Sequence, residues 1–304
     1  MSNISQKFII SMLRPYIENE LPGWGKVYEY FVGSYENDGF WQDAEKKTIR
    51  GKRHGYLMEL DLSHWSERLA FFLKRWYDLP TQLLIDEVIK PDDIVVDIGG
   101  NIGMFTLAAR AKTGNKGKIY AFEPNPLPRE KFERHMKINN ITNVEIKPFA
   151  LHEHSGETTL YFPKINTGEG SLKPLHYSEE WTIAITVEIK VGDEELIDIS
   201  PRFIKIDVEG AEIGVLVGME NIIEQAKPII AVEYIQEHLQ RFGTGFKDIQ
   251  LFANKHHYRI FQLAVLRQGC QNQLSLTPAS EGVSGDCDLV LIHENDSSLE
   301  KFVH

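Results

Sequence analysis

Hydrophobic and polar positions follow a regular rhythm only in the second part of the chain. From Pro91 onward, short apolar runs of strand length alternate with longer segments whose apolar residues recur at helical spacing. The pattern predicts strands at 94–97, 118–122, 144–149, 203–207, 229–233, 258–263 and 288–293, and helices at 102–112, 127–139, 211–225 and 246–257. Strands that alternate with helices are typical of a parallel sheet covered on both faces. The last two strands lack an intervening helix, which favours an antiparallel partner at one edge.

Two segments depart from this rhythm. Residues 1–80 are rich in Trp, Tyr and Phe and show no regular alternation, so we predict an N-terminal extension there. It would serve as a lid or as a contact surface for substrate or for a second subunit, unless its aromatic residues are mainly core. Residues 156–192 contain two segments with period-two alternation, typical of a β-hairpin inserted into the 81–304 domain.

Composition narrows the class of protein. The chain has 304 residues, of which 42% are hydrophobic and 25% charged, as in an ordinary globular domain. Its two cysteines exclude a disulfide scaffold and favour a reducing cytoplasm. A formal net charge of -11 disfavours nucleic acid as a partner. No apolar run is long enough to span a membrane, and the first residues lack the pattern of a signal peptide.

A glycine-rich turn follows the first strand of the regular region. It contains Asp97, Gly99, Asn101 and Gly103. Ligands bind beyond the carboxyl ends of strands in open α/β sheets, and glycine lets the backbone approach a ligand closely. The spacing does not match the G-x-G-x-x-G fingerprint that cradles a pyrophosphate. An ordinary strand-to-helix turn is the alternative, but an acid before a tight turn favours a cofactor without phosphate.

The second strand also ends in an acid. Glu123 lies 26 residues after Asp97 and is followed by Pro124 and Asn125. A carboxylate at this position can accept two charge-assisted hydrogen bonds from vicinal ribose hydroxyls. Each motif alone has a structural explanation, as a turn or as a solvated acid. Together and in this order, they predict a site for S-adenosylmethionine, with S-adenosylhomocysteine as the product.

Several segments resemble the FkbM family of S-adenosylmethionine-dependent methyltransferases. They are VVDIGGNIGMFTLAA (95–109), YAFEPNP (120–126), FALHEHSGETTLYF (149–162), FIKIDVEGAEIGVLVG (203–218) and IIAVEY (229–234). The resemblance implies a class I methyltransferase fold: a Rossmann-like, doubly wound, mostly parallel seven-stranded sheet with an antiparallel last strand. It also implies methylation of hydroxyl oxygens, notably on sugars, glycans and natural products.

The resemblance also assigns roles to single residues. By this likeness, Asp97, Gly99, Asn101 and Gly103 surround the methionine moiety. Glu123 would hold the ribose, with Pro124 and Asn125 beside it. Ala150 and Leu151 would flank the adenine.

A lysine interrupts the strand at 203–207. Alternation places Lys205 and Asp207 on one face of that strand. A lysine in a buried strand needs an acidic partner, and Asp207, Asp97 and Glu233 are the alternatives. A structural ion pair at the rim of the sheet is our preferred interpretation of this lysine.

Methyl transfer to a hydroxyl benefits from a general base. Four residues near the expected position of the methyl group are candidates: Asp207, Glu209, Glu233 and His238. Glu212 is interpreted as a helix-start residue, because an acid there complements the helix dipole. The acids show no matched set of ligands in the sequence, so we expect no metal site, and a divalent metal remains the less favoured alternative.

Other functions remain open at this point. The main alternatives are an NAD-type oxidoreductase, which the glycine spacing disfavours, and a non-catalytic scaffold with the same fold. Methylation of bases is disfavoured because Asp-Val-Glu-Gly, and not Asn/Asp-Pro-Pro-Tyr, begins at Asp207. The acceptor is expected to be a small molecule or a glycan, and the sequence leaves a homo-oligomer open.

Overall fold

The structure is a computed structural model that describes residues 3–164, 168–176, 178–268, 271–279, 283 and 285–304. The chain divides into two compact units. The smaller unit contains residues 1–78 and 137–140, and the larger contains residues 79–136 and 141–304.

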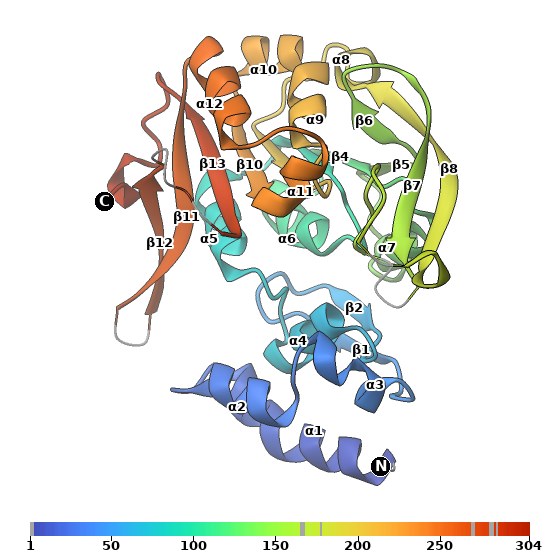
Figure 1. The fold of residues 1–304 in the computed structure, drawn as a ribbon. Helices are drawn as coiled ribbons and strands as arrows, with labels where there is room; N and C mark the ends of the chain where they lie inside the picture. The colour runs from blue at the N-terminus through green and yellow to red at the C-terminus, as the bar shows by residue number, and fades with distance from the viewer. Residues whose placement is uncertain (1–2, 165–167, 177, 269–270, 280–282, 284) are drawn as a thin grey trace. The chain divides into compact units, whose positions relative to one another are not determined.

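The larger unit is built on an eight-stranded sheet (Figure 1). Its strands are β3 (Ile94–Ile98), β4 (Lys118–Phe122), β5 (Val144–Lys147), β9 (Phe203–Ile206), β10 (Ile229–Tyr234), β11 (Tyr258–Gln268), β12 (Gln271–Pro278) and β13 (Cys287–His293). Their spatial order is β12-β11-β13-β10-β9-β3-β4-β5. The pairs from β10 to β5 are parallel, whereas β13 is antiparallel to both β10 and β11. Without β12, this is the class I methyltransferase arrangement with its reversed last strand, as predicted.

Helices cover both faces of this sheet (Figure 1). They are α5 (Leu79–Val88), α6 (Met104–Thr113), α7 (Pro126–Ile138), α8 (Gly192–Glu195), α9 (Glu212–Gly218), α10 (Glu220–Ala226), α11 (Gln236–Arg241) and α12 (Phe246–Lys255). On one face α5 contacts α6, and Phe105 of α6 stacks on Phe203. On the other face, Leu216 and Ile249 of α9 and α12 join the core with Ile204. None of the helices in the described residues is long and apolar enough to cross a membrane.

The eighth strand is the main addition to the predicted sheet. The prediction placed only a connection between the last two strands, but β12 pairs with the extended β11 from Phe261↔Pro278 to Gln268↔Gln271. Its sequence is rich in Gln, Asn, Ser and Thr, so apolar alternation is reduced to Leu274 and Leu276, which are both buried. A polar edge strand of this kind gives little hydrophobic signal.

Two predicted elements end earlier than the sequence pattern suggested. The third strand stops at Lys147, and Ala150–His152 forms a separate strand, β6. The predicted helix 211–225 is divided into α9 and α10 at Met219. At Gly218 a Cβ atom would lie 2.2 Å from the backbone oxygen of His152, so the chain needs glycine to pass β6. The end of α9 thus lies directly against β6.

A second sheet of three strands belongs to the same unit. It consists of β6, β7 (Gly156–Pro163) and β8 (Thr182–Val191), in the order β6-β8-β7. β7 and β8 form an antiparallel pair, while β6 is parallel to β8. Leu160, Phe162 and Val187 form a small core of their own between the strands. The hairpin is therefore a packed element, with its own apolar centre.

The smaller unit is mainly helical with one short hairpin. Its elements are α1 (Asn3–Glu18), α2 (Trp24–Phe31), η1 (Tyr35–Asn37), α3 (Asp38–Trp41), β1 (Lys47–Arg50), β2 (Leu57–Leu60) and α4 (Trp65–Leu73). Tyr28, Trp41 and Phe72 are buried, and Phe72 contacts each of the other two rings edge to face. Tyr30 and Phe31 are exposed. Much of the aromatic content of this segment is therefore core, which was the alternative to a binding surface.

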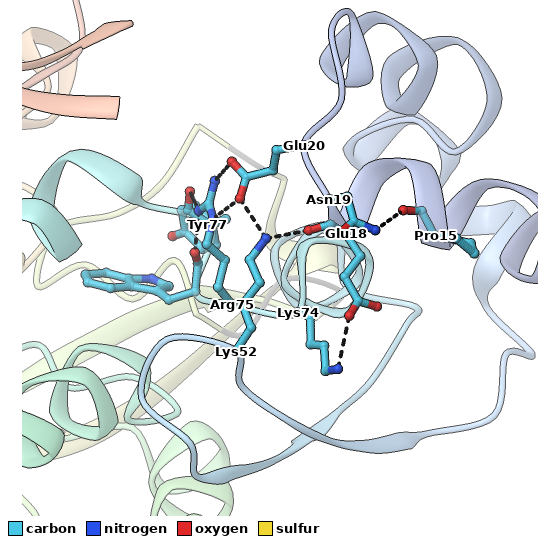
Figure 2. Close-up of polar contacts among 9 residues, drawn as sticks. Pro15, Glu18, Asn19, Glu20, Lys52, Lys74, Arg75 and Tyr77 are labelled. Atoms are coloured by element: carbon cyan, nitrogen blue, oxygen red, sulfur yellow. Dashed lines mark hydrogen bonds and ion pairs between the residues drawn. The ribbon is translucent and has the colours of Figure 1, made fainter. Parts of the chain in front are cut away.

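A buried arginine ties the end of this unit together (Figure 2). The Arg75 guanidinium, 2% exposed, donates to both carboxylate oxygens of Glu20 at 3.0 and 2.9 Å. It also donates to the backbone oxygens of Trp76 and Tyr77. Lys52 binds the same carboxylate at 2.7 Å. Burial alone would raise the pKa of Glu20, but these two cations lower it to about 2. The network fixes the segment that follows α1 to the end of the unit.

Candidate cofactor and catalytic site

The glycine turn connects β3 to α6 at the carboxyl edge of the large sheet. Gly99, Asn101 and Gly103 have φ angles of 81°, 48° and 83°, in the left-handed region that glycine and asparagine tolerate best. A Cβ atom at Gly99 would lie 1.8 Å from the backbone oxygen of Asp207. The turn therefore passes directly against the end of β9, and glycine is required for the fit.

Helix α7 supports this turn from the side. A Cβ atom at Gly103 would lie 2.3 Å from the ring of Phe132. His135, fully buried, has its Nδ1 2.8 Å from the backbone oxygen of Ile102. Phe132 is also fully buried, and no sequence pattern indicated that His135 fixes the turn. The turn is thus held by packing and does not depend on a ligand for its shape.

Glu123 lies at the end of β4 and faces the same turn. Its carboxylate accepts a hydrogen bond from the Asn101 backbone N–H at 2.7 Å and one from the Asn125 N–H at 2.8 Å. The side chain is buried, and burial raises its pKa to about 7 against the effect of these two donors. Arg129 donates to the backbone oxygens of Glu123 and Pro124 and so fixes the loop. The turn and the acid, 22 residues apart in sequence, form one site.

The geometry of Glu123 fits a ribose diol. A carboxylate offers about four acceptor positions, and the backbone uses two of them. The remaining positions can accept hydrogen bonds from two vicinal hydroxyl groups. The turn lacks the longer glycine-rich loop that would bind a pyrophosphate, because Phe132 occupies the space beside Gly100 and Gly103. These residues therefore fit S-adenosylmethionine better than a dinucleotide.

A buried ion network lies at the centre of the sheet edge. In the sheet register Asp97 lies opposite Lys205. The Lys205 ammonium lies 2.9 Å from an Asp207 oxygen and 3.7 Å from Asp97, and it donates to the backbone oxygen of Gly99 at 2.8 Å. Asp97, 0% exposed, accepts a further hydrogen bond from Thr106 at 2.6 Å. The predicted ion pair is confirmed, with both Asp207 and Asp97 as partners of the lysine.

This network keeps the lysine charged. Burial alone would lower the pKa of Lys205, but the Asp207 and Asp97 carboxylates raise it above its ordinary value. Burial raises the pKa of Asp97, although Lys205 and Thr106 oppose that rise. Because Lys205 also binds Gly99, it joins β3, the glycine turn and β9. Thr106 was not among the residues that the sequence pointed to.

The remaining catalytic candidates meet beside this network. Glu209 follows β9, Glu233 lies near the end of β10 and His238 lies in α11. One ligand atom of each lies within 4.8 Å of the others. The His238 Nδ1 is 2.7 Å from a Glu209 oxygen. We call Glu209, Glu233 and His238 the acidic triad. His238 therefore takes part in the site and is not a plain surface residue of its helix.

Burial and neighbouring charged groups shift the pKa values of all three residues of the acidic triad. Burial raises the pKa of Glu233 well above its ordinary value, and the neighbouring carboxylates of Asp207 and Glu209 raise it further. Burial also raises the pKa of Glu209, opposed by its contact with His238. Burial alone would lower the pKa of His238, but the Glu209 carboxylate reverses this shift and raises it. The site thus concentrates several acidic groups that are only partly exposed to solvent.

Glu212 closes the turn between β9 and α9. Its Oε1 accepts hydrogen bonds from the Gly210 N–H at 3.0 Å and the Val208 N–H at 3.3 Å, and α9 begins at this residue. This agrees with the helix-start interpretation. The side chain is 2% exposed, and burial raises its pKa to about 7.

We expect Glu212→Gln to stabilise the protein at alkaline pH. A raised pKa in the folded state means that this carboxyl favours folding below about pH 4.5 and loses that contribution as the pH rises through about 7. Glutamine stays neutral and keeps the accepting oxygen. The full shift corresponds to about 3 kcal/mol, and we expect about 1–2 kcal/mol because an amide accepts weaker hydrogen bonds. Urea unfolding at pH 5 and pH 8 measures this, and an equal gain at both values would contradict the explanation.

The hairpin loop approaches the site from the other side. Ser171, fully buried, donates a hydrogen bond to the backbone oxygen of Glu209 at 3.0 Å. A Cβ atom at Gly168 would lie 2.7 Å from the side chain of Asn101. The sequence analysis placed this segment within the predicted β-hairpin of 156–192. The loop between β7 and β8 thus contacts both the glycine turn and the acidic triad.

Two of the predicted cofactor residues lie in a different setting. Ala150 and Leu151 belong to β6, which pairs with β8. The Leu151 side chain is 1% exposed and packs in the hydrophobic core with Phe149. Their role beside an adenine stays a prediction, and the buried Leu151 side chain offers no surface for it. Asn125, in contrast, is held against Glu123 by its backbone N–H.

The fold and the site together define a class of protein. The strand order is that of class I methyltransferases, and the first two strands end in the glycine turn and the acid that fit an adenosine cofactor without phosphate. A family model described as "Methyltransferase FkbM domain" matches residues 97–260, more than half of the chain. The chain belongs to this family, as the resemblance predicted.

Similar proteins carry methyltransferase names. "Methyltransferase 1" of Beauveria bassiana is 32% identical over 155 residues, which are 43% of this chain and 60% of that protein. "Hexuronic acid methyltransferase AglP" of Haloferax volcanii is 30% identical over 155 residues, 49% of this chain and 59% of that protein. The matches thus span about 60% of these relatives. The solved methyltransferase FkbM of Methylobacillus flagellatus KT is 15% identical with a TM-score of 0.40, and it covers 88% of this chain and 60% of that chain.

Proposed function

We propose that this chain is an S-adenosylmethionine-dependent O-methyltransferase that acts on a hydroxyl group of a sugar, a glycan or a natural product. The observation that carries the proposal is the buried Glu123 carboxylate, held against the glycine turn by the Asn101 N–H with acceptor positions to spare. When bound, the cofactor supplies an electrophilic methyl group on a sulfonium. Binding of S-adenosylhomocysteine but not NADH to the purified chain tests this, and the reverse result would favour an oxidoreductase.

The acids at the sheet edge suit transfer to oxygen. The oxygen–methyl bond forms as the sulfur–methyl bond breaks, and the sulfur keeps the electron pair. A hydroxyl acceptor must also lose its proton, and a positioned base contributes typically about 10²–10⁴-fold to the rate. Asp207 and the acidic triad lie directly beyond the glycine turn, where that proton would be released. Lys205 holds Asp207 in place at 2.9 Å.

The acceptor class follows from the same residues and from one relative. The name of the Haloferax volcanii relative specifies a hexuronic acid. The site of this chain is strongly acidic, which favours an acceptor that presents neutral hydroxyl groups to it. Mass spectrometry after incubation with S-adenosylmethionine and panels of sugars, uronic acids and hydroxylated natural products identifies the acceptor. Methylation of nitrogen or carbon alone would refute an O-methyltransferase.

We expect at least one of four alanine variants to lose most of its methyl transfer without losing the cofactor. The variants are Asp207→Ala, Glu209→Ala, Glu233→Ala and His238→Ala. Removal of the base lowers kcat by about 100-fold or more, because proton transfer is then left to water. The dissociation constant of S-adenosylhomocysteine, measured in parallel, should change little in that variant. Normal turnover in all four variants would show that none of these groups is the base.

A further inference from the structure

The acidic triad has the composition and geometry of a metal site. The residues come from the turn after β9, from β10 and from α11, and one ligand atom from each lies within 4.8 Å of the other two. The triad offers two carboxylates and one imidazole. Carboxylates suit Mg²⁺ and Mn²⁺, whereas imidazole suits the transition metals, so the set fits a first-row divalent cation such as Mn²⁺. The sequence named all three residues as candidate bases, but it could not show that their ligand atoms come together.

The contacts of the triad place two ligand atoms side by side. His238 Nδ1 is buried and lies 2.7 Å from a Glu209 oxygen, and this contact with the carboxylate raises the pKa of His238. When the imidazole gives up that proton, its nitrogen and the carboxylate oxygen both present lone pairs, and a cation between them satisfies both. Nearby Glu212, which is 2% exposed and whose charge acts on His238, also leaves its Oε2 without a hydrogen-bond partner.

The charged groups around the triad also favour a bound cation. Asp207 and Glu212 add two acids beside the triad, and both act electrostatically on its members. Lys205 is already engaged with Asp207, with Asp97 and with the backbone oxygen of Gly99. Crowded carboxylates of this kind are stabilised when a cation binds among them. A divalent ion at the triad provides that charge.

We propose that Glu209, Glu233 and His238 bind one divalent cation of the Mn²⁺ class, and that this cation binds the hydroxyl group that is methylated. The second part rests on the proposed function. Three protein ligands leave coordination positions open, so two vicinal oxygens of a sugar can bind the ion. A bound cation lowers the pKa of the hydroxyl, which leaves Asp207, outside the triad, to accept its proton.

The test is a titration of the chelator-treated full-length chain with Mn²⁺, followed by electron paramagnetic resonance. We expect one Mn²⁺ per chain, with affinity reduced about tenfold or more in Glu209→Gln, Glu233→Gln and His238→Ala, because each removes one of three ligands. His152→Ala is the matched control, since His152, Glu153 and His154 form the other such group among the described residues, largely exposed. Wild-type affinity in that variant supports the triad.

Two outcomes of this titration would overturn the metal site. One is no binding of Mn²⁺ to the wild type at millimolar concentration, and the other is loss of binding in His152→Ala with retention in His238→Ala. Pulsed resonance on the wild type needs no variant: nitrogen modulation from a coordinated imidazole is expected, and its absence refutes the assignment. Methyl transfer that survives excess EDTA would refute the role of the ion but leave the O-methyltransferase intact. Mn²⁺ bound at the triad without methyl transfer to any hydroxyl would refute the proposed function alone.

Discussion

Replacing Lys205 with methionine is expected to destabilise the larger unit by about 3–5 kcal/mol, the usual cost of removing one partner of a buried ion pair. The lysine side chain is 11% exposed and the Asp97 side chain 0%, so no water replaces the lost ammonium around Asp97. The Gly99 carbonyl loses a donor as well. Urea unfolding followed by circular dichroism measures the change. We also expect weaker binding of S-adenosylhomocysteine, because Lys205 holds the glycine turn.

Two further variants separate charge from packing in this prediction. Lys118→Met removes a lysine from the neighbouring strand β4, where the pair with Glu145 is exposed, and should cost less than about 1 kcal/mol. Asp97→Asn in the Lys205→Met background removes the unpaired charge and should restore part of the stability. If Lys205→Met costs no more than Lys118→Met, the buried network does not stabilise the fold through its charges.

The sequence predicted those parts of the site that directly follow a recognisable strand. The glycine turn and Glu123 each follow a strand with clear apolar alternation, so the sequence alone places both at the carboxyl edge of the sheet. The hydrogen bond from the Asn101 N–H to Glu123 follows from that placement. The same logic placed Lys205 opposite an acid, since strand alternation alone sets which side chains share a face.

Contacts between distant segments could not be predicted in the same way. His238 meets Glu209 because the chain turns sharply at Glu209 and Gly210, with φ angles of 56° and 111°, and a Cβ atom at Gly210 would lie 2.4 Å from the His238 backbone oxygen. No periodicity reports such an approach. The polar strand β12 was missed because its pairing with β11 depends on backbone hydrogen bonds, which leave no apolar pattern.

Binding of the cofactor product should be about 100-fold weaker in Glu123→Gln. Two charge-assisted hydrogen bonds to the ribose become weaker neutral ones, and hydrogen bonds to charged groups are worth about 1.5–3 kcal/mol each. The amide also turns an N–H₂ group toward one of the two backbone donors, from Asn101 or Asn125, that the carboxylate now accepts. Isothermal titration calorimetry with S-adenosylhomocysteine measures the loss. Glu145→Gln on the next strand, where the carboxylate is exposed, is the control and should bind normally.

The pH dependence of binding separates the contribution of the Glu123 charge from that of the side chain's shape. Burial raises the pKa of Glu123 to about 7, so the ribose-binding carboxylate is mostly ionised at pH 8 and mostly protonated at pH 6. Only the ionised form accepts both ribose hydroxyls, so the affinity of the wild type should fall about tenfold from pH 8 to pH 6. The Glu123→Gln variant has no such proton to take up and should lack this fall. An equal fall in both proteins would assign the pH dependence to another group and leave Glu123 without a role in holding the ribose.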